Sequence, residues 1–180
     1  PAQARVLDVT GKTIMPGMID VHAHLCNETS FNPHGSVGDL IPFTAIRGVV
    51  AAKAMLDSGF TTCRDLGALG YANVALKQAV DRGLVPGPRL LTSAEMVLGV
   101  GTAEDGYFRP EIKFPRTGVF SGPDEARRAV RTQVYHGADV IKLIASGLVS
   151  SNAPNTPWDQ EITREEMAAV VDEAHRMNAS

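Results

Sequence analysis

Residues 14–25 read Ile14-Met15-Pro16-Gly17-Met18-Ile19-Asp20-Val21-His22-Ala23-His24-Leu25, and this stretch predicts a buried β-strand. Side chains alternate across a strand, so His22 and His24 are expected on one face together with Asp20. Val21, Ala23 and Leu25 are expected on the other face, towards helices. An extended lead over residues 6–9 and a turn at Gly11-Lys12 come before the strand.

Strand-like and helix-like segments alternate along the rest of the chain. Two helix starts carry capping signals, because Thr163 is followed by Glu166 and Ser121 is followed by Pro123 and Asp124. Glycines are expected to end the earlier helices. Strands are predicted over residues 60–66, 89–97 and 139–145, and helices over 45–58, 72–82, 121–137 and 163–178.

The order β-α-β-α-β-α-β-α predicts an α/β fold, in which a parallel sheet is covered by helices. Turns from helix to strand are short, whereas the connections over residues 26–44, 98–120 and 146–162 are long. Long loops after the strands are typical of a (β/α)8 TIM barrel, whose active site they build. Four βα units are half of such a barrel, so the expected fold is the first half of a TIM barrel, β1-α1 to β4-α4.

Composition sets the broad class. The 180 residues are 44% hydrophobic and 21% charged, with a formal net charge of -3, which is typical of a globular domain and gives no reason to expect nucleic-acid or membrane binding. No apolar run approaches the roughly 20 residues that span a bilayer. Cys26 and Cys63 are too few for a disulfide framework, so a reducing, cytoplasmic location is expected. The N-terminus, which has no Met, resembles a cut end.

His22 and His24 are candidate metal ligands. Two imidazoles two residues apart on one strand face can reach a single ion, and zinc accepts neutral imidazole readily. Asp20, on the same face, is a candidate acceptor for a histidine ring N–H. The alternative is that both histidines are polar strand-end residues, because a His-x-His pair alone is weak evidence.

Three ordered segments resemble the amidohydrolase superfamily, and most closely the branch with imidazolonepropionase-like proteins, Xaa-Pro dipeptidases and zinc carboxypeptidases. The segments lie at residues 11–24, 59–67 and 137–147, so the resemblance spans nearly the whole chain. It implies a catalytic TIM barrel together with a small β-sandwich domain. Residues 1–13 would be the remnant of the sandwich, and residues 14–180 the first half of the barrel.

The resemblance also implies a role for Lys142. In the family this strand-four lysine reacts with carbon dioxide, and the carboxylated lysine bridges two metal ions, expected here to be zinc. Burial lowers a lysine pKa towards the neutral amine that this chemistry requires, and Val140 and Ile144 flank Lys142 on the same strand face. The alternative is a lysine that extends from a strand end to solvent.

The implied activity is hydrolysis of amide or peptide bonds in small molecules such as Xaa-Pro dipeptides or N-acyl amino acids, by metal-bound hydroxide. A cyclic-amide hydrolase of imidazolonepropionase type shares the same metal site. The family completes the site with two later histidines and an aspartate beyond Ser180, so this chain is expected to have little activity alone. A catalytically incomplete half-barrel would need a complementing chain or would form a homo-oligomer.

Other candidates have more ordinary alternatives. Arg64 and Asp65 are expected to form a structural ion pair or to support the metal ligands. Residues 146–160, which include Trp158, are either a substrate loop or a plain surface connection. Leu148 departs from the branch, where a second glycine is usual. The remaining candidates are expected to be solvated or plainly buried, and they are His34, His136, His175, Cys26 and Cys63.

Overall fold

The structure is a computed structural model that describes residues 4–27, 38–102, 116–147 and 156–180. Within these ranges strands and helices alternate, as predicted. In chain order they are β1 (Met18–Ala23), α2 (Ile41–Asp57), β2 (Phe60–Asp65), the 3-10 turn η1 (Leu69–Tyr71), α3 (Ala72–Asp81), β3 (Arg89–Thr92), β4 (Val97–Gly99), β5 (Val119–Phe120), α4 (Pro123–Tyr135), β6 (Leu143–Ile144) and α5 (Arg164–Arg176).

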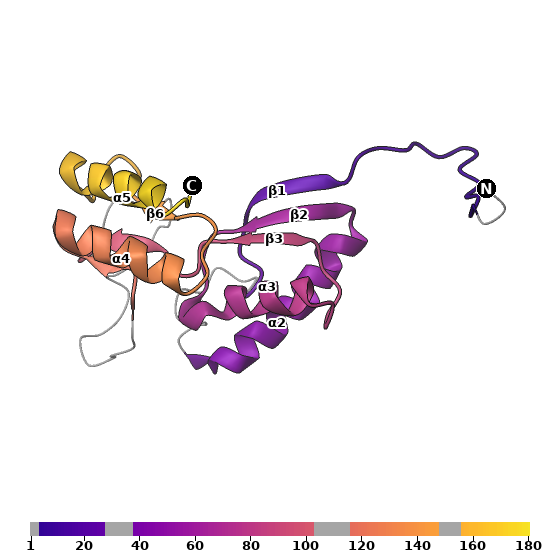
Figure 1. Ribbon diagram of the computed structural model, residues 1–180, viewed down its shortest axis with the longest axis horizontal. Helices are drawn as coiled ribbons and strands as arrows, with labels where there is room; N and C mark the ends of the chain where they lie inside the picture. Colours follow the sequence, from indigo (N-terminus) through magenta and orange to yellow (C-terminus); the bar gives the residue numbers. More distant parts are fainter. Residues whose placement is uncertain (1–3, 28–37, 103–115, 148–155) are drawn as a thin grey trace.

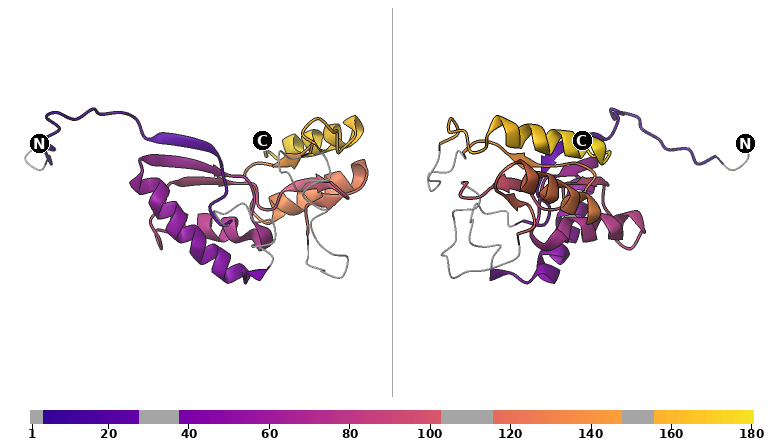
Figure 2. Two further views of the ribbon diagram at one scale, coloured as in Figure 1. Left: turned by 180° about the vertical axis from the view of Figure 1, so that it is seen from behind. Right: turned by 60° about the vertical axis from the view of Figure 1, so that its left-hand side comes forward.

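The strands form two parallel three-stranded sheets, in the orders β1-β2-β3 and β5-β4-β6. Helices α2 and α3 lie along one face of the first sheet, as both long views show (Figures 1 and 2). Helices α4 and α5 lie side by side against the second sheet (Figure 1). The predicted parallel α/β arrangement is therefore confirmed, and it leaves the other face of the first sheet without a covering helix among the described elements.

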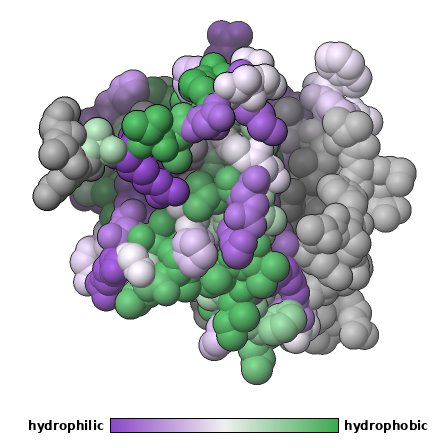
Figure 3. Space-filling view, turned by 90° about the vertical axis from the view of Figure 1, so that its right-hand side faces the viewer, coloured by the Kyte–Doolittle hydropathy of each residue, from purple (hydrophilic) through white to green (hydrophobic). Residues whose placement is uncertain are grey.

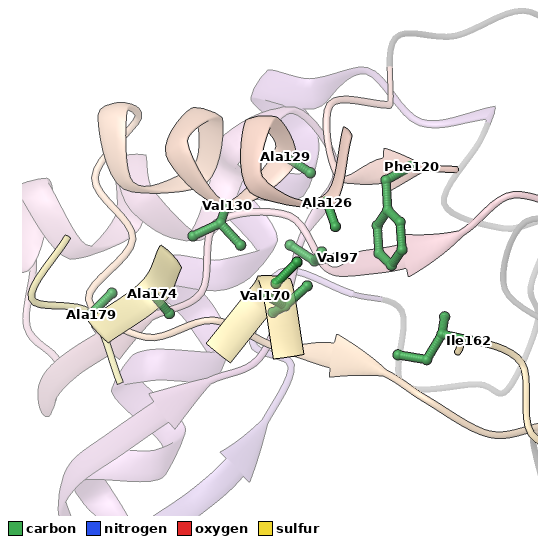
Figure 4. Packing of buried hydrophobic residues seen from close by; sticks show 10 residues of the cluster. Val97, Phe120, Ala126, Ala129, Val130, Ile162, Val170, Ala174 and Ala179 are labelled. Carbon is green, nitrogen blue, oxygen red and sulfur yellow. The ribbon is translucent and has the colours of Figure 1, made fainter. Parts of the chain in front are cut away.

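Two hydrophobic cores hold the helices on the sheets. In the first, Cys63 of β2 and Leu90 of β3 pack against α2 and α3, with Leu25 following β1. In the second, Val97 and Phe120 pack against apolar residues of α4 and α5 such as Val130 (Figure 4). The buried residues of these two cores are 0–6% exposed, so the helix-covered face of each sheet is closed to solvent.

The predicted strand over residues 89–97 is divided into β3 and β4. Ala94 between them has a φ of 60°, which extended backbone does not allow, and the Ser93 and Glu95 amides donate to Asp65 and Gln133. The predicted strand over residues 139–145 is regular only at Leu143–Ile144. At residues 93–95 and 139–141, main-chain amides therefore donate to neighbouring chain segments instead of continuing regular strand pairing.

Two helix starts differ from the prediction. Helix α2 begins at Ile41 rather than at residue 45, because Pro42 is well suited to a first helical turn. The expected capping box at Ser121 and Asp124 is wrong, since the N-cap of α4 is Gly122, at φ 81°. The Thr163–Glu166 capping box of α5 is confirmed in both of its hydrogen bonds.

Residues 4–17 form no helix or strand and extend from β1 as an exposed arm (Figure 1). The expected turn is present, because the Lys12 amide donates to the Val9 carbonyl at 2.9 Å and Gly11 has a φ of 73°. The assignment of residues 1–13 to a β-sandwich remains a prediction.

Several apolar side chains of β1 face solvent. Val21 was expected to pack against helices, yet it is 56% exposed, and Ile19 is 64% exposed. The reason is that β1 is an edge strand with a neighbour on one side only, and its register shifts between Asp20 and Ala23. Figure 3, viewed from the side on which the N-terminal arm extends, shows hydrophobic side chains gathered among polar ones on this face. Among the described residues, no helix has the length and apolar character to cross a bilayer.

Candidate metal centre

The two histidines of the His-x-His motif lie at the carboxyl end of β1. Their ring centroids are 5.4 Å apart and their planes are inclined by 60°. Ala23, between them, packs against the core beneath the sheet, so His22 and His24 project from the uncovered face, as the alternation predicted. Two imidazoles are therefore close enough to face a common ion.

Lys142, the residue before β6, lies next to this histidine pair. Its Nζ is 3.4 Å from Nε2 of His22, although the two residues are 120 positions apart in sequence. The Lys142 carbonyl accepts the Val97 amide at 2.8 Å, and this bond ties the segment before β6 to β4. Pairing with β4 thus holds the segment that carries Lys142, and the contact with His22 joins the end of the first sheet to the second sheet.

The electrostatic surroundings favour neutral His22. Burial lowers the pKa of the His22 imidazole first, and the positive charges of Lys142, His24 and Arg64 lower it further, while Asp20 opposes them. Neutral imidazole is the form that offers a lone pair to a metal ion. The Arg64 charge, which remains when Lys142 is carboxylated, would also favour a carbamate anion at this position.

His24 has a defined partner for one ring nitrogen. Its Nδ1 is 3.1 Å from the carbonyl oxygen of Gly67, in the loop after β2. Because a carbonyl oxygen only accepts, this hydrogen bond requires a proton on Nδ1, and in the neutral ring the lone pair is then on Nε2. The chemistry of the donors therefore fits part of a divalent-metal site: two imidazoles with a lysine facing one of them.

Asp20 and Arg64 both bind the main chain around His22. The Asp20 carboxylate accepts the His22 amide at 2.9 Å, and Arg64 Nε donates to the Val21 carbonyl at 2.7 Å. Asp20 was predicted to accept a histidine ring N–H. The hydrogen bond in the structure is instead from the main-chain N–H of His22. Both residues hold the strand end that presents His22.

Asp65 is fully buried and has other partners than Arg64. Its carboxylate accepts N–H groups from Leu25 at 2.8 Å, Gly67 at 3.2 Å and the Asn73 side chain at 3.0 Å. Burial raises the pKa of this carboxyl group, and the three donors and the His24 charge counteract the rise. Asn73 and Gly67 were not predicted as site residues. The signals for them were a polar residue in the first turn of a predicted helix and the last glycine of the 59–67 segment.

The remaining candidates lie away from this cluster or outside the described residues. His136 is the C-cap of α4 and stacks on Tyr71, with ring centroids 4.3 Å apart, while His175 lies exposed in the last turn of α5. Trp158 is 93% exposed. His34 and Leu148 lie outside the described residues.

The two cysteines are free and buried. Burial, together with the nearby Asp65 carboxylate, raises the pKa of each thiol to about 12. Within the four described ranges, no group of three or more His, Cys, Asp and Glu side chains is arranged to hold a metal ion. The candidate site therefore depends on the lysine as well as on the histidine pair.

Comparison with known proteins gives the family. The model of the Amidohydrolase family matches residues 13–180, so the chain belongs to the amidohydrolase family. Its fold is accordingly of the TIM-barrel type, of which these residues cover part. The three sequence segments that resembled this superfamily are thus correctly interpreted.

Relatives within the family include hydrolases. Ochratoxinase from Aspergillus niger is 30% identical over 184 residues, a match that covers 92% of this chain and 37% of that protein. A prolidase solved with N-methylphosphonate-L-proline is 35% identical, with a TM-score of 0.85 over 98% of this chain and 44% of that one. A Xaa-Pro dipeptidase with methionine in its active site is 30% identical, with a TM-score of 0.81 over 91% and 41%. The chain therefore spans well under half the length of these relatives.

Proposed function

We propose that these residues form the first part of the metal site of a hydrolase that cleaves carbon–nitrogen bonds in amides or peptides. The observation that carries the proposal is the 3.4 Å approach of Lys142 Nζ to His22 Nε2, beside the His24 ring. A strand-end lysine reaching for solvent has no reason to meet a histidine pair from another strand. Membership of the amidohydrolase family supports the same reaction class.

The proposed cofactor is a pair of divalent ions, expected to be zinc. His22 and His24 would hold one ion, and Lys142, once carboxylated, would bridge both. Divalent ions bound here would polarise the scissile carbonyl and activate water. For carboxylation, the neutral Lys142 amine bonds to the carbon of carbon dioxide and one N–H proton passes to solvent, which leaves a carbamate anion. The Arg64 guanidinium near His22, which keeps its charge when Lys142 is carboxylated, would stabilise such an anion.

The proposed substrates are Xaa-Pro dipeptides or N-acyl amino acids. The support comes from the prolidase and the Xaa-Pro dipeptidase among the structural relatives. A cyclic amide of the imidazolonepropionase type is the competing substrate, because it requires the same metal site. The substrate loop proposed at residues 146–160 includes 148–155, which lie outside the described residues.

A second proposal concerns what the 180 residues do alone. In the described part of the chain only two histidines and one lysine meet, and this favours a site that needs further ligands from a complementing chain or a longer polypeptide. We therefore expect little turnover when the 180-residue chain is assayed with zinc against Xaa-Pro dipeptides and N-acyl amino acids. Turnover at rates typical of family members would contradict this expectation.

Metal titration tests the first proposal directly. Zinc binding is measured by calorimetry with and without bicarbonate, and the carbamate by a ¹³C signal from labelled bicarbonate. His22→Ala and Lys142→Ala are expected to lower zinc affinity at least about 10-fold, and Lys142→Ala to abolish the carbamate signal. His175→Ala and Lys53→Ala are the matched controls, because both side chains are exposed and remote. Equal zinc affinity in all five proteins would refute the site.

The proposed surroundings are a reducing compartment such as the cytoplasm and a homo-oligomeric or complementing partner. The two free buried thiols support the first, and the solvent-exposed apolar side chains of β1 support the second. Size measurement of the chain with and without reductant separates disulfide-linked from noncovalent assembly.

A further inference from the structure

We infer that Asp65 is a positioning residue that sets the tautomer and direction of the His24 ring, an inference that rests on the proposed metal site. Asp65 does not contact the ring. It binds the two main-chain segments between which the ring lies. One carboxylate oxygen accepts the amide of Leu25, the residue after His24, and the other accepts the amide of Gly67, the residue whose carbonyl meets Nδ1 of His24.

Two hydrogen bonds through Gly67 connect Asp65 to the His24 ring. The Gly67 amide is 3.2 Å from Asp65 Oδ1, and the Gly67 carbonyl is 3.1 Å from His24 Nδ1. Gly67 has a φ of 132°, and a Cβ there would lie 2.6 Å from Met96 Cγ, so the loop requires glycine at this position. The carboxylate therefore fixes the loop whose carbonyl selects the Nδ1–H form of His24.

Asn73 holds the carboxylate in turn. Its fully buried side chain donates to Asp65 Oδ1 at 3.0 Å and to the Ala94 carbonyl at 3.1 Å. The same carbonyl accepts the Ala68 amide, which lies one residue beyond Gly67. Helix α3 and the segment between β3 and β4 thus anchor the orientation of Asp65.

An ordinary structural role for Asp65 makes a different prediction. A carboxylate that merely satisfies buried amides affects stability alone. A positioning residue also affects which ring nitrogen of His24 carries the proton, and hence which nitrogen faces a metal ion. An amide at position 65 keeps the side-chain volume but replaces one acceptor oxygen by a donor, so it cannot accept both main-chain N–H groups.

The test is ¹⁵N NMR of the histidine rings in the 180-residue chain, at a pH where they are neutral. Signals of His24 are assigned with a His24→Gln variant. In the unmodified chain His24 is expected as the Nδ1–H tautomer, and in Asp65→Asn as a mixture. Zinc affinity of Asp65→Asn is expected to fall about 10- to 100-fold. Glu95→Gln is the matched control, because Glu95 is also buried and accepts amides from Gly70 and Thr117.

The outcomes separate this inference from the proposed function. If the unmodified chain binds no zinc, the metal site fails, and the tautomer still decides the role of Asp65. A folded Asp65→Asn chain with an unchanged His24 tautomer would overturn the inference, as would an equal tautomer change in Glu95→Gln. If Asp65→Asn does not fold, Asn73→Ala decides instead. It keeps the carboxylate but frees its orientation, and it is expected to shift the tautomer in the same direction.

Discussion

Lys142 and Glu173 show how single charged residues acquire their environment from distant parts of the chain. Lys142 lies beside His22 because β4 and β6 pair in parallel next to the first sheet. Glu173 of α5 has a side chain that is 1% exposed, and its carboxylate accepts a hydrogen bond from Arg131 of α4 at 2.6 Å. Neither partner is close in sequence. Only the packing of the elements determines which charges meet.

Glu173 is expected to make stability depend on pH. The hydrogen bond from Arg131 lowers the pKa of this carboxyl group in the folded chain, and the charges of Arg131, Arg176 and Arg127 lower it further. Its stabilisation is therefore present above the unfolded-state pKa, about 4.3, and is lost as the pH falls towards the folded-state value. Urea unfolding of the unmodified chain and Glu173→Gln should show a stability difference that narrows as the pH falls below the unfolded-state pKa. A constant difference would count against this, and Glu165→Gln, on the exposed first turn, serves as control.

The two cysteines are expected to be unreactive towards alkylating reagents in the folded chain. With a thiol pKa of about 12, Cys26 and Cys63 carry very little thiolate at pH 8, about one part in 10⁴. Alkylation by iodoacetamide, followed by mass spectrometry, should leave both residues unmodified in the folded chain and modify both in urea. Ser58→Cys, at an exposed helix end, provides the reactive comparison. Rapid labelling of Cys26 or Cys63 in native buffer would contradict their burial.

Among the elements, α5 is the one whose start the sequence predicted most closely. The Thr163 hydroxyl accepts the Glu166 amide at 3.2 Å, and the Glu166 carboxylate accepts the Thr163 amide at 2.8 Å. Both bonds are local, so they need no tertiary contact. The predicted Ser121 cap was wrong because Gly122 adopts a backbone conformation at φ 81° that places the cap one residue later.

Loss of the α5 cap is expected to lower the stability of the chain moderately. Thr163→Ala removes the hydroxyl acceptor of one helix-end N–H and should lower the free energy of unfolding by about 1 kcal/mol. The measurement is urea denaturation followed by circular dichroism. Thr132→Ala is the matched control, since this hydroxyl donates to the Arg128 carbonyl inside α4 and caps nothing. Equal effects of the two substitutions would show that the cap contributes nothing specific.

Considered as a whole, the molecule leaves a sheet edge and apolar side chains exposed. Ile19 and Val21 of β1 are more than half exposed, on a strand with a single neighbour. Exposed apolar edges favour association. The 180-residue chain is therefore expected to self-associate as its concentration rises.

Sedimentation velocity tests this association. Val21→Lys should reduce it with little change in the unfolding temperature, because the Val21 side chain is more than half exposed. Leu84→Lys is the control, since Leu84 is 72% exposed in the turn after α3, away from β1. A chain that stays monomeric over a hundredfold concentration range would contradict the expectation.

The sequence by itself determined the α/β alternation, the strand that carries His22 and His24, the family, and the capping box of α5. These features depend on short-range patterns: side-chain alternation along a strand, helix-end hydrogen bonds and the spacing of residues within short motifs. Tertiary structure alone decided the break between β3 and β4, the exposure of Val21, the meeting of Lys142 with His22, and the hydrogen bonds that Asp65 accepts around His24. Most of these contacts join groups that lie tens of residues apart, such as Lys142 with His22 and Asp65 with Leu25, and chain packing brings them within hydrogen-bonding distance. The exposure of Val21 instead follows from the position of β1 at the edge of its sheet.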